Sequence, residues 1–262
     1  MKNFWVSTGY SAGTNYEHEC KQSTKSESVL WPRPGPYLLN PQLGVPTHSI
    51  LTKTHCAAYD SLNGYSSSNM TLNEFALACA SPRSKTGARL PVYPLFKVVH
   101  IVRDPFDNMV ARMHHAVNNG HVERLEHSRE GLMEWCRRVD GVDQAIGVRI
   151  FGAEVVELVS KVPCGVDLVH YVQWHNRALE MAARQGLESY VFHYEDYETD
   201  FEATVQSLMS FIGQPTVYPP APFIAGKHYR DLYEVQEVES ARQLLQRLAS
   251  PACWELLRYY FD

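Results

Sequence analysis

The sequence predicts an α/β domain built around a parallel sheet. Two short apolar runs, Phe96–Val102 and Ser189–His193, have the near-continuous hydrophobic character of interior parallel strands. Segments with helical periodicity follow each of them, and strands that alternate with helices are typical of a parallel sheet. The 262 residues are 45% hydrophobic and 20% charged, which is enough apolar material for a sizeable core. No linker divides the chain, so we expect a single domain over residues 1–262.

The first part of the chain is weakly patterned. Residues 1–48 are rich in Gly, Ser and Pro, and the prolines of "WPRPGPYLLNPQLGVP" exclude a central strand or a long helix there. We therefore expect an irregular, loop-rich N-terminal segment. A short strand at Ser49–Thr54 and a short helix at Leu72–Ala80 should follow it.

A helix is expected directly after the first apolar strand. Asp107 can cap a helix that runs from Asn108 to about Val117, because an aspartate accepts hydrogen bonds from the first amides of a helix. The triplet Asn118-Asn119-Gly120 should end this helix.

The second half of the chain is predominantly helical in pattern. Helices are expected at residues 128–138 and 151–161, and Val166–Gln185 is a stronger candidate because its apolar positions recur at helical spacing. That stripe consists of Leu168, Val172, His175 and Leu179. Thr199 to Glu202 has the pattern of a capping box before a helix that Gly213 ends. Two tail helices should follow, one with Val238, Ala241, Leu245 and Leu248 on one face and one that begins with Ser250 as cap and Pro251 at its first position.

Charge and cysteine usage exclude several classes of protein. The net charge of −5 and the pI of about 6.2 argue against a general nucleic-acid binder. The six cysteines form no C-x-x-C pair, so we expect no zinc or thioredoxin-like site, and reduced cysteines rather than disulfides. No run approaches the ~18 apolar residues of a membrane span, and the N-terminus does not resemble a signal peptide. As the chain stands, these features suggest a cytoplasmic protein.

Arg103 is the leading candidate for binding an anion. It follows the apolar strand Phe96–Val102 directly, and ligands of open parallel sheets lie at the carboxyl ends of the strands. A guanidinium can bind two phosphate oxygens at once. The helix after Pro105 should add unpaired amides and a partial positive charge. The alternative is that Arg103 only pairs with Asp107 or another carboxylate.

The stretch "VRDPFDNMVARMHH" resembles the 3′-phosphate signature of sulfotransferases that use 3′-phosphoadenylyl sulfate. In that family a strand is followed by Arg-Asn/Asp-Pro-x-Asp and by a helix that carries a serine, and the arginine and the serine bind the 3′-phosphate of the nucleotide. Arg103, Pro105 and Asp107 match. The serine position falls on Ala111, so one hydroxyl contact is missing, and Arg112 points elsewhere on the helix.

Other segments resemble the same family in order and spacing. "LTKTH" is similar to its Lys-Thr-His strand end, which implies that His55 is the general base and that Lys53 binds the transferred sulfuryl group. "GKHYRDLYEV" lies at the place of the C-terminal nucleotide-binding loop and retains the cation Lys227. "FHYEDYETDF" resembles a structural strand and helix near the nucleotide. The resemblance implies a three-layer α/β/α fold of the P-loop nucleotide-binding type and a chain that uses 3′-phosphoadenylyl sulfate without a metal.

The family's loop of the type Pro-(Lys/Arg)-Ser-Gly-(Thr/Asn)-Thr-Trp, which binds the 5′-phosphosulfate, has no counterpart before Lys53. With it the N-terminal strand is missing. The chain is thus either a truncated or a degenerate member. The resemblance implies transfer of a sulfuryl group to a hydroxyl on a carbohydrate or small metabolite; the alternative is a non-catalytic nucleotide-binding protein. A nucleotide kinase of related topology would need a Gly-Lys-Ser/Thr loop. A carbohydrate-type enzyme would work in the Golgi lumen.

Several further side chains are assigned to structural roles. His114, His115 and His121 lack metal-site geometry and are expected at the surface or as caps. Tyr171 and Trp174 could stack on an adenine or a sugar ring, but we favour the core. Adjacent strand residues face opposite ways, so Glu195 and Asp196 are expected to cap or to form salt bridges rather than act as a catalytic pair.

Overall fold

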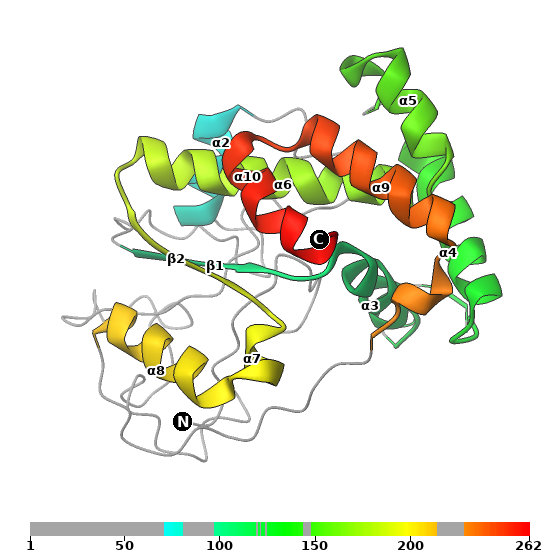
Figure 1. Cartoon of the computed structure of the whole chain (residues 1–262). Helices are drawn as coiled ribbons and strands as arrows, with labels where there is room; N and C mark the ends of the chain where they lie inside the picture. Colours follow the sequence, from blue (N-terminus) through cyan, green and yellow to red (C-terminus); the bar gives the residue numbers. More distant parts are fainter. Residues whose placement is uncertain are drawn as a thin grey trace.

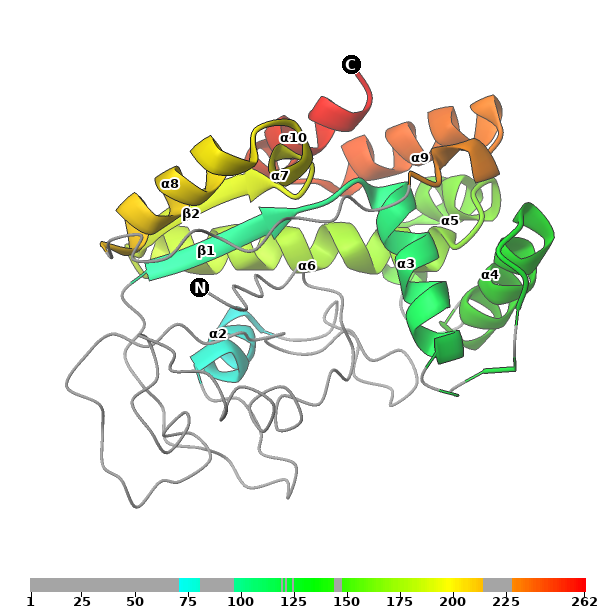
Figure 2. The same ribbon diagram turned by 90° about the horizontal axis from the view of Figure 1, so that it is seen from below.

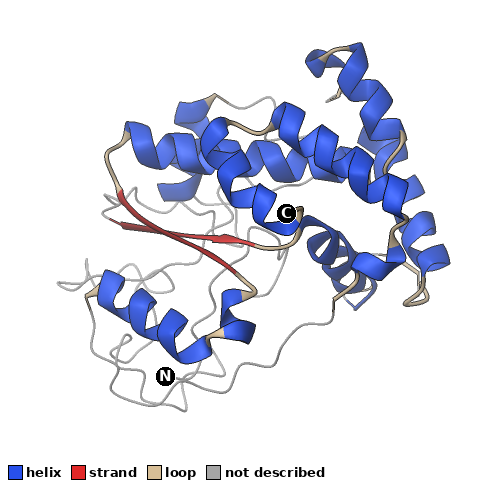
Figure 3. Cartoon of the chain, in the orientation of Figure 1, coloured by secondary structure: helices blue, strands red, loops and turns tan. Residues whose placement is uncertain are grey.

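The computed structural model describes residues 71–80, 97–118, 120, 122–123, 125–143, 148–213 and 228–262. Helices dominate this part of the chain, and two strands lie among them (Figures 1 and 3). In chain order the helices and strands are α2 Leu72–Ala80, β1 Lys97–Val102, α3 Pro105–Asn118, α4 Arg129–Asp143, α5 Ala153–Ser160, α6 Gly165–Arg184, β2 Glu188–His193, α7 Asp196–Thr199, α8 Phe201–Ile212, α9 Val235–Leu248 and α10 Pro251–Leu257. Short 3₁₀ turns occur at Arg149–Phe151, Arg230–Leu232 and Arg258–Tyr260.

The two strands form a parallel pair. Their register runs from Lys97 opposite Glu188 to Val102 opposite His193, so both carboxyl ends lie at the same edge. The parallel pairing of these two runs is as predicted. The described part of the chain contains no third strand, and the wider three-layer sheet remains a prediction.

Side chains of β1 alternate between two sets of helices. Val99 and Ile101 pack with aromatic residues of β2, α7 and α8, whereas Val98 packs with α2 and α6, and Val102 joins the main core. This alternation follows from the two-residue period of a strand. Figure 2 shows α6 running along the strand pair. Figure 1 shows that α7 and α8 lie on the side of the strand pair opposite to α6.

The main core lies at the carboxyl-end side of the strands. It joins α3, α4, α6, α9 and α10, and the long central helix α6 contacts most of the others. Its fully buried large side chains include Phe106, Met109, Leu132, Leu168, Tyr171, Leu244 and Leu257. This core fixes the start of α3 against the middle of the molecule.

A pair of buried histidines joins β1 to α6. His100 Nε2 and His175 Nδ1 are 2.6 Å apart, and their rings stack with centroids 4.9 Å apart. Burial lowers the pKa of His100 to about 4 and the pKa of His175 well below its usual value. Both imidazoles are therefore neutral at pH 7 and act as core side chains that satisfy each other.

Most predicted elements are confirmed, with bounds that differ at the caps. The helix expected after the first strand begins at Pro105 rather than Asn108, because Asp104 and not Asp107 caps it. The last helix before Gly213 is capped by Asp200, since Thr199 already ends the short helix α7. Gly213 ends α8 with a φ of 78°, a conformation that glycine adopts without steric cost.

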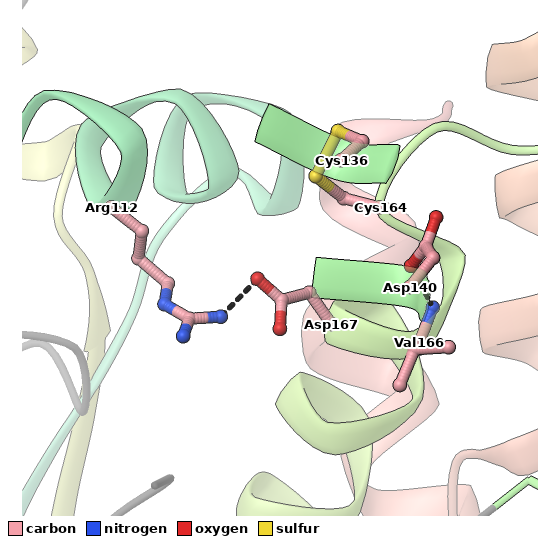
Figure 4. The surroundings of a disulfide bond; sticks show 6 residues. All are labelled: Arg112, Cys136, Asp140, Cys164, Val166 and Asp167. Carbon is pink, nitrogen blue, oxygen red and sulfur yellow. Dashed lines mark hydrogen bonds and ion pairs between the residues drawn. A yellow bond between two sulfur atoms is a disulfide. The ribbon is translucent and has the colours of Figure 1, made fainter. Parts of the chain in front are cut away.

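The cysteine prediction is wrong for the described residues. Cys136 on α4 and Cys164, which directly precedes α6, form a disulfide with Cα atoms 4.4 Å apart (Figure 4). Cys79 is also disulfide-bonded, and the buried Cys253 is the free cysteine of the described part of the chain. The 28-residue separation gives no local motif. Only the helix packing brings the two sulfurs together.

Among the described residues, no helix is both long enough and apolar enough to span a membrane. The expected loop-rich segment 1–48 and the strand Ser49–Thr54 lie outside the described residues.

Candidate functional site

The paired strand ends place Arg103 beside Tyr194. Because Val102 and His193 are opposite each other, the residues that follow them emerge side by side. The guanidinium carbon of Arg103 lies 4.8 Å from the centre of the Tyr194 ring, a cation–π distance. Tyr171 on α6 donates a hydrogen bond of 2.7 Å to the carbonyl oxygen of Arg103. Two aromatic residues thus fix the backbone and the side chain of this arginine.

The guanidinium of Arg103 is not used in an ion pair with any described carboxylate. Its Nε is buried and has no hydrogen-bond partner among the described residues. The alternative in which Arg103 pairs with Asp107 is not observed, because the carboxylate of Asp107 accepts from other donors. A buried donor without an acceptor is costly, so this nitrogen fits a site that an anion completes.

The amides at the start of α3 do not extend that site. Asp104 Oδ1 accepts from the backbone N–H groups of Phe106 at 2.7 Å and Asp107 at 3.2 Å, and its carbonyl accepts from Asn108 at 2.9 Å. Pro105 has no N–H. The prediction of unpaired helix amides is therefore wrong. The reason is that the second residue of the Arg-Asp-Pro motif caps its own helix.

Residues 228–230 close over the first turn of α3. Tyr229 N–H donates to Asp107 Oδ1 at 2.6 Å, and His228 Nδ1 lies 3.2 Å from Asp107 Oδ2. Arg230 Nη1 lies 3.8 Å from Asp104 Oδ2. The carboxylate of Asp107 is almost fully buried and holds the C-terminal segment against the helix, a role that the sequence pattern did not reveal.

Ala111 is half-buried on α3, one turn after Asp107. The neighbouring Arg112 faces α6, where it forms an ion pair with the buried Asp167 (Figure 4). This agrees with the prediction that Arg112 does not replace the hydroxyl missing at Ala111.

Two carboxylates next to the strand ends already have hydrogen-bond partners. Glu195 accepts from the backbone N–H of Asp104 at 3.0 Å and from the Tyr260 hydroxyl at 2.7 Å, so it joins the two strand ends to the C-terminus. Burial, with a contribution from the nearby Asp107, raises the pKa of Asp104 to about 6. Glu195 and Asp104 at this edge of the sheet are therefore already engaged in hydrogen bonds.

The residues assigned to structural roles behave mostly as expected. Tyr171 and Trp174 are buried, and Glu195 and Asp196 accept backbone hydrogen bonds. His114, which was expected at the surface or as a cap, is half-buried and stacks on His127 with ring centroids 3.8 Å apart. Within the described ranges, no group of three potential metal ligands occurs.

Two residues of the site were missed in the sequence. Tyr194 could have been found, since it directly follows the second strand and parallel register places it next to Arg103. His228 had no local signal, because its partners lie far away in the chain. Lys53, His55, Lys227 and His121 lie outside the described residues.

Comparisons with known proteins give one finding. A family model described as a sulfotransferase domain matches residues 88–224, which is more than half of the chain and includes Arg103 and Ala111. A search of curated proteins and a search of solved structures each found no match. The matched domain is a P-loop-like α/β fold whose members transfer sulfuryl groups, and it spans both described strands. The chain belongs to the sulfotransferase family.

Proposed function

We propose that this protein transfers a sulfuryl group from 3′-phosphoadenylyl sulfate to a hydroxyl on a carbohydrate or small metabolite, and that Arg103 binds the 3′-phosphate of the donor. The observation that carries the proposal is the state of Arg103. It stands at the carboxyl end of the parallel strand β1, with its guanidinium over the ring of Tyr194 and with a buried Nε that lacks a partner among the described residues. Such a donor fits a bound phosphate oxygen.

Two further positions belong to the proposed donor site. Ala111 stands where the family carries a serine, so the 3′-phosphate would receive no hydroxyl from this helix. Lys227 immediately precedes His228, which the structure places against the start of α3. A lysine next to that contact would add a second cation to the phosphate site. With the α3 amides occupied by Asp104, side-chain cations would supply the attraction.

The proposed chemistry uses Lys53 and His55. His55 would take the proton from the acceptor hydroxyl as its oxygen forms a bond to sulfur, while the bond from sulfur to the phosphate oxygen breaks and 3′,5′-adenosine bisphosphate leaves. Lys53, two residues earlier on the expected strand, would face the same side and neutralise the transferring oxygens. A histidine is suited to this proton transfer near neutral pH. In the proposed fold, this strand would extend the β1–β2 pair into the central sheet of a three-layer domain.

Calorimetric titration tests the donor site directly. Wild-type protein should bind 3′,5′-adenosine bisphosphate more tightly than 5′-adenosine monophosphate, because only the former carries the 3′-phosphate. Arg103→Gln should weaken bisphosphate binding by about 10- to 100-fold, as expected for losing hydrogen bonds to a charged group, and leave monophosphate binding nearly unchanged. Arg184→Gln, at an exposed arginine on α6, is the matched control. Equal affinity of the wild type for both nucleotides would reject the proposed site.

A transfer assay separates an enzyme from a binding protein. With radiolabelled donor and a panel of hydroxyl acceptors, the wild type should give labelled product and His55→Ala should lower its rate by at least 100-fold, the scale of general-base catalysis. Nucleotide binding without any transfer would favour the alternative of a non-catalytic sulfotransferase-like protein. Equal rates for the wild type and the variant would remove His55 as the base.

The disulfide bears on the compartment. Cys136–Cys164 and the bonded Cys79 favour an oxidising environment, so of the two compartments that the sequence suggested we propose the Golgi lumen. Mass spectrometry of peptides from protein isolated under thiol-blocking conditions should find Cys136 and Cys164 linked. If both are alkylated as thiols, the assignment to the lumen is wrong.

A further inference from the structure

His228 contacts two carboxylates from different elements. Its Nδ1 lies 3.2 Å from Asp107 Oδ2 on α3, and its Nε2 lies 3.2 Å from Glu198 Oε2 on α7. α3 follows β1, and α7 follows β2. One imidazole thus bridges the helices that begin at the two strand ends, next to the proposed phosphate site.

The geometry selects one protonation state of His228. A neutral imidazole carries a hydrogen on only one nitrogen, and an ionised carboxylate can only accept. Both contacts can therefore be hydrogen bonds only when both ring nitrogens are protonated. The bridge as observed is that of an imidazolium between two anions.

We propose that His228 is a positioning residue, and that its protonated form clasps residues 228–230 onto the starts of α3 and α7, next to the proposed phosphate site. This inference rests on the proposed function, since it concerns residues that lie beside the proposed donor site. The clasp makes donor binding tighter at mildly acidic pH than at alkaline pH.

The charges around His228 support this direction. Partial burial lowers the pKa of His228, but the attraction of Asp107 and Glu198 outweighs it and leaves the pKa above its usual value. The neighbouring Arg230 is directed to Asp104 and to the rings of Phe106 and Phe261, so it does not oppose the imidazolium. A raised pKa means that the bridge is complete at low pH and is lost as the pH rises through that value.

The effect should be partial. The backbone N–H of Tyr229 donates to Asp107 at 2.6 Å whatever the charge of His228, so the segment stays attached on one side. The ring of His228 is also largely exposed, and exposed ion pairs are weak. We expect loss of the bridge to weaken donor binding by about two- to fivefold.

Two measurements on the full chain test the clasp. In the first, NMR titration of the His228 ring should give a pKa above the usual 6.5 for the wild type. Glu198→Gln should lower it, and Glu255→Gln, at an exposed glutamate of α10, should not. In the second, calorimetry should give the affinity for 3′,5′-adenosine bisphosphate at pH 6 and pH 8 for the wild type and His228→Gln. The phosphates of the nucleotide titrate equally with both proteins. The ratio of wild-type affinity to His228→Gln affinity at each pH therefore reports the contribution of His228 alone.

Each outcome has one meaning. A wild-type advantage of about two- to fivefold at pH 6 that vanishes at pH 8 supports the clasp. An affinity ratio that is the same at both pH values overturns it, as does a His228 pKa at or below 6.5. If neither protein binds the bisphosphate, the proposed function fails, and the NMR titration still decides whether the bridge forms.

Discussion

Removal of the Cys136–Cys164 disulfide should cost a large share of the stability of the domain. The bond closes a loop of 28 residues. Applying the chain-entropy relation to a loop of that length gives a free-energy loss of about 3.6 kcal/mol at 25 °C. The loop contains the end of α4 and all of α5, so its closure restricts the unfolded chain between two helices of the main core.

Urea denaturation of the Cys136→Ala/Cys164→Ala double variant measures this loss. With a denaturant slope of roughly 2.5 kcal/mol per molar, the midpoint should fall by about 1.4 M. Cys253→Ala is the matched control, because it removes a buried sulfur that is not bonded, and it should cost far less. A double variant whose midpoint and slope equal those of the control would refute the loop-closure argument.

Three other predictions concern stability and the support of Arg103. Gly165→Ala should lower the melting temperature, because the added Cβ would lie 2.3 Å from the backbone oxygen of Val159. Gly141→Ala is the control on the exposed face of α4. Its added Cβ would have no atom within 4 Å, so this variant should be more stable than the wild type by about 0.5–1 kcal/mol. Burial raises the pKa of Asp140 to about 7, so the wild type should lose stability as the pH rises from 4 to 7. In urea denaturation at a series of pH values from 4 to 7, the free energy of unfolding of Asp140→Asn should fall less than that of the wild type, by on the order of 2 kcal/mol. If the free energies of the two proteins change in parallel with pH, the argument is contradicted. Tyr171→Phe removes the hydrogen bond to the Arg103 carbonyl and should cost about 1 kcal/mol in urea denaturation, with bisphosphate affinity falling in calorimetry; an unchanged affinity would show that this bond does not position the arginine.

The local elements were predictable because their signals are local. The apolar run of β1, the stripe on α6 and the Ser250-Pro251 start of α10 each lie within a few turns of chain, and the structure confirms them. The position of Arg103 at a strand end follows from the same run. Periodicity and capping thus identify where the candidate site begins.

The contacts that complete the site depend on distant partners. Asp107 resembled a helix cap, and only the docking of Tyr229, 122 residues later, shows what its carboxylate does. Asp104 took the cap instead because it directly precedes Pro105, which fits the first helical position. The disulfide was equally hidden, since its two cysteines meet only through the packing of α4 against α6. Long-range pairing of this kind leaves no pattern in a single sequence.

The cap formed by Asp104 has a thermodynamic consequence for any anion that arrives at Arg103. With its pKa raised to about 6, this carboxyl is only partly protonated near neutrality, and a second negative charge close by would raise its pKa again. Occupancy of the site should then draw a proton from the solvent. The heat of association would accordingly vary with the ionisation enthalpy of the buffer, and the strength of association would increase as the solution is acidified toward pH 6.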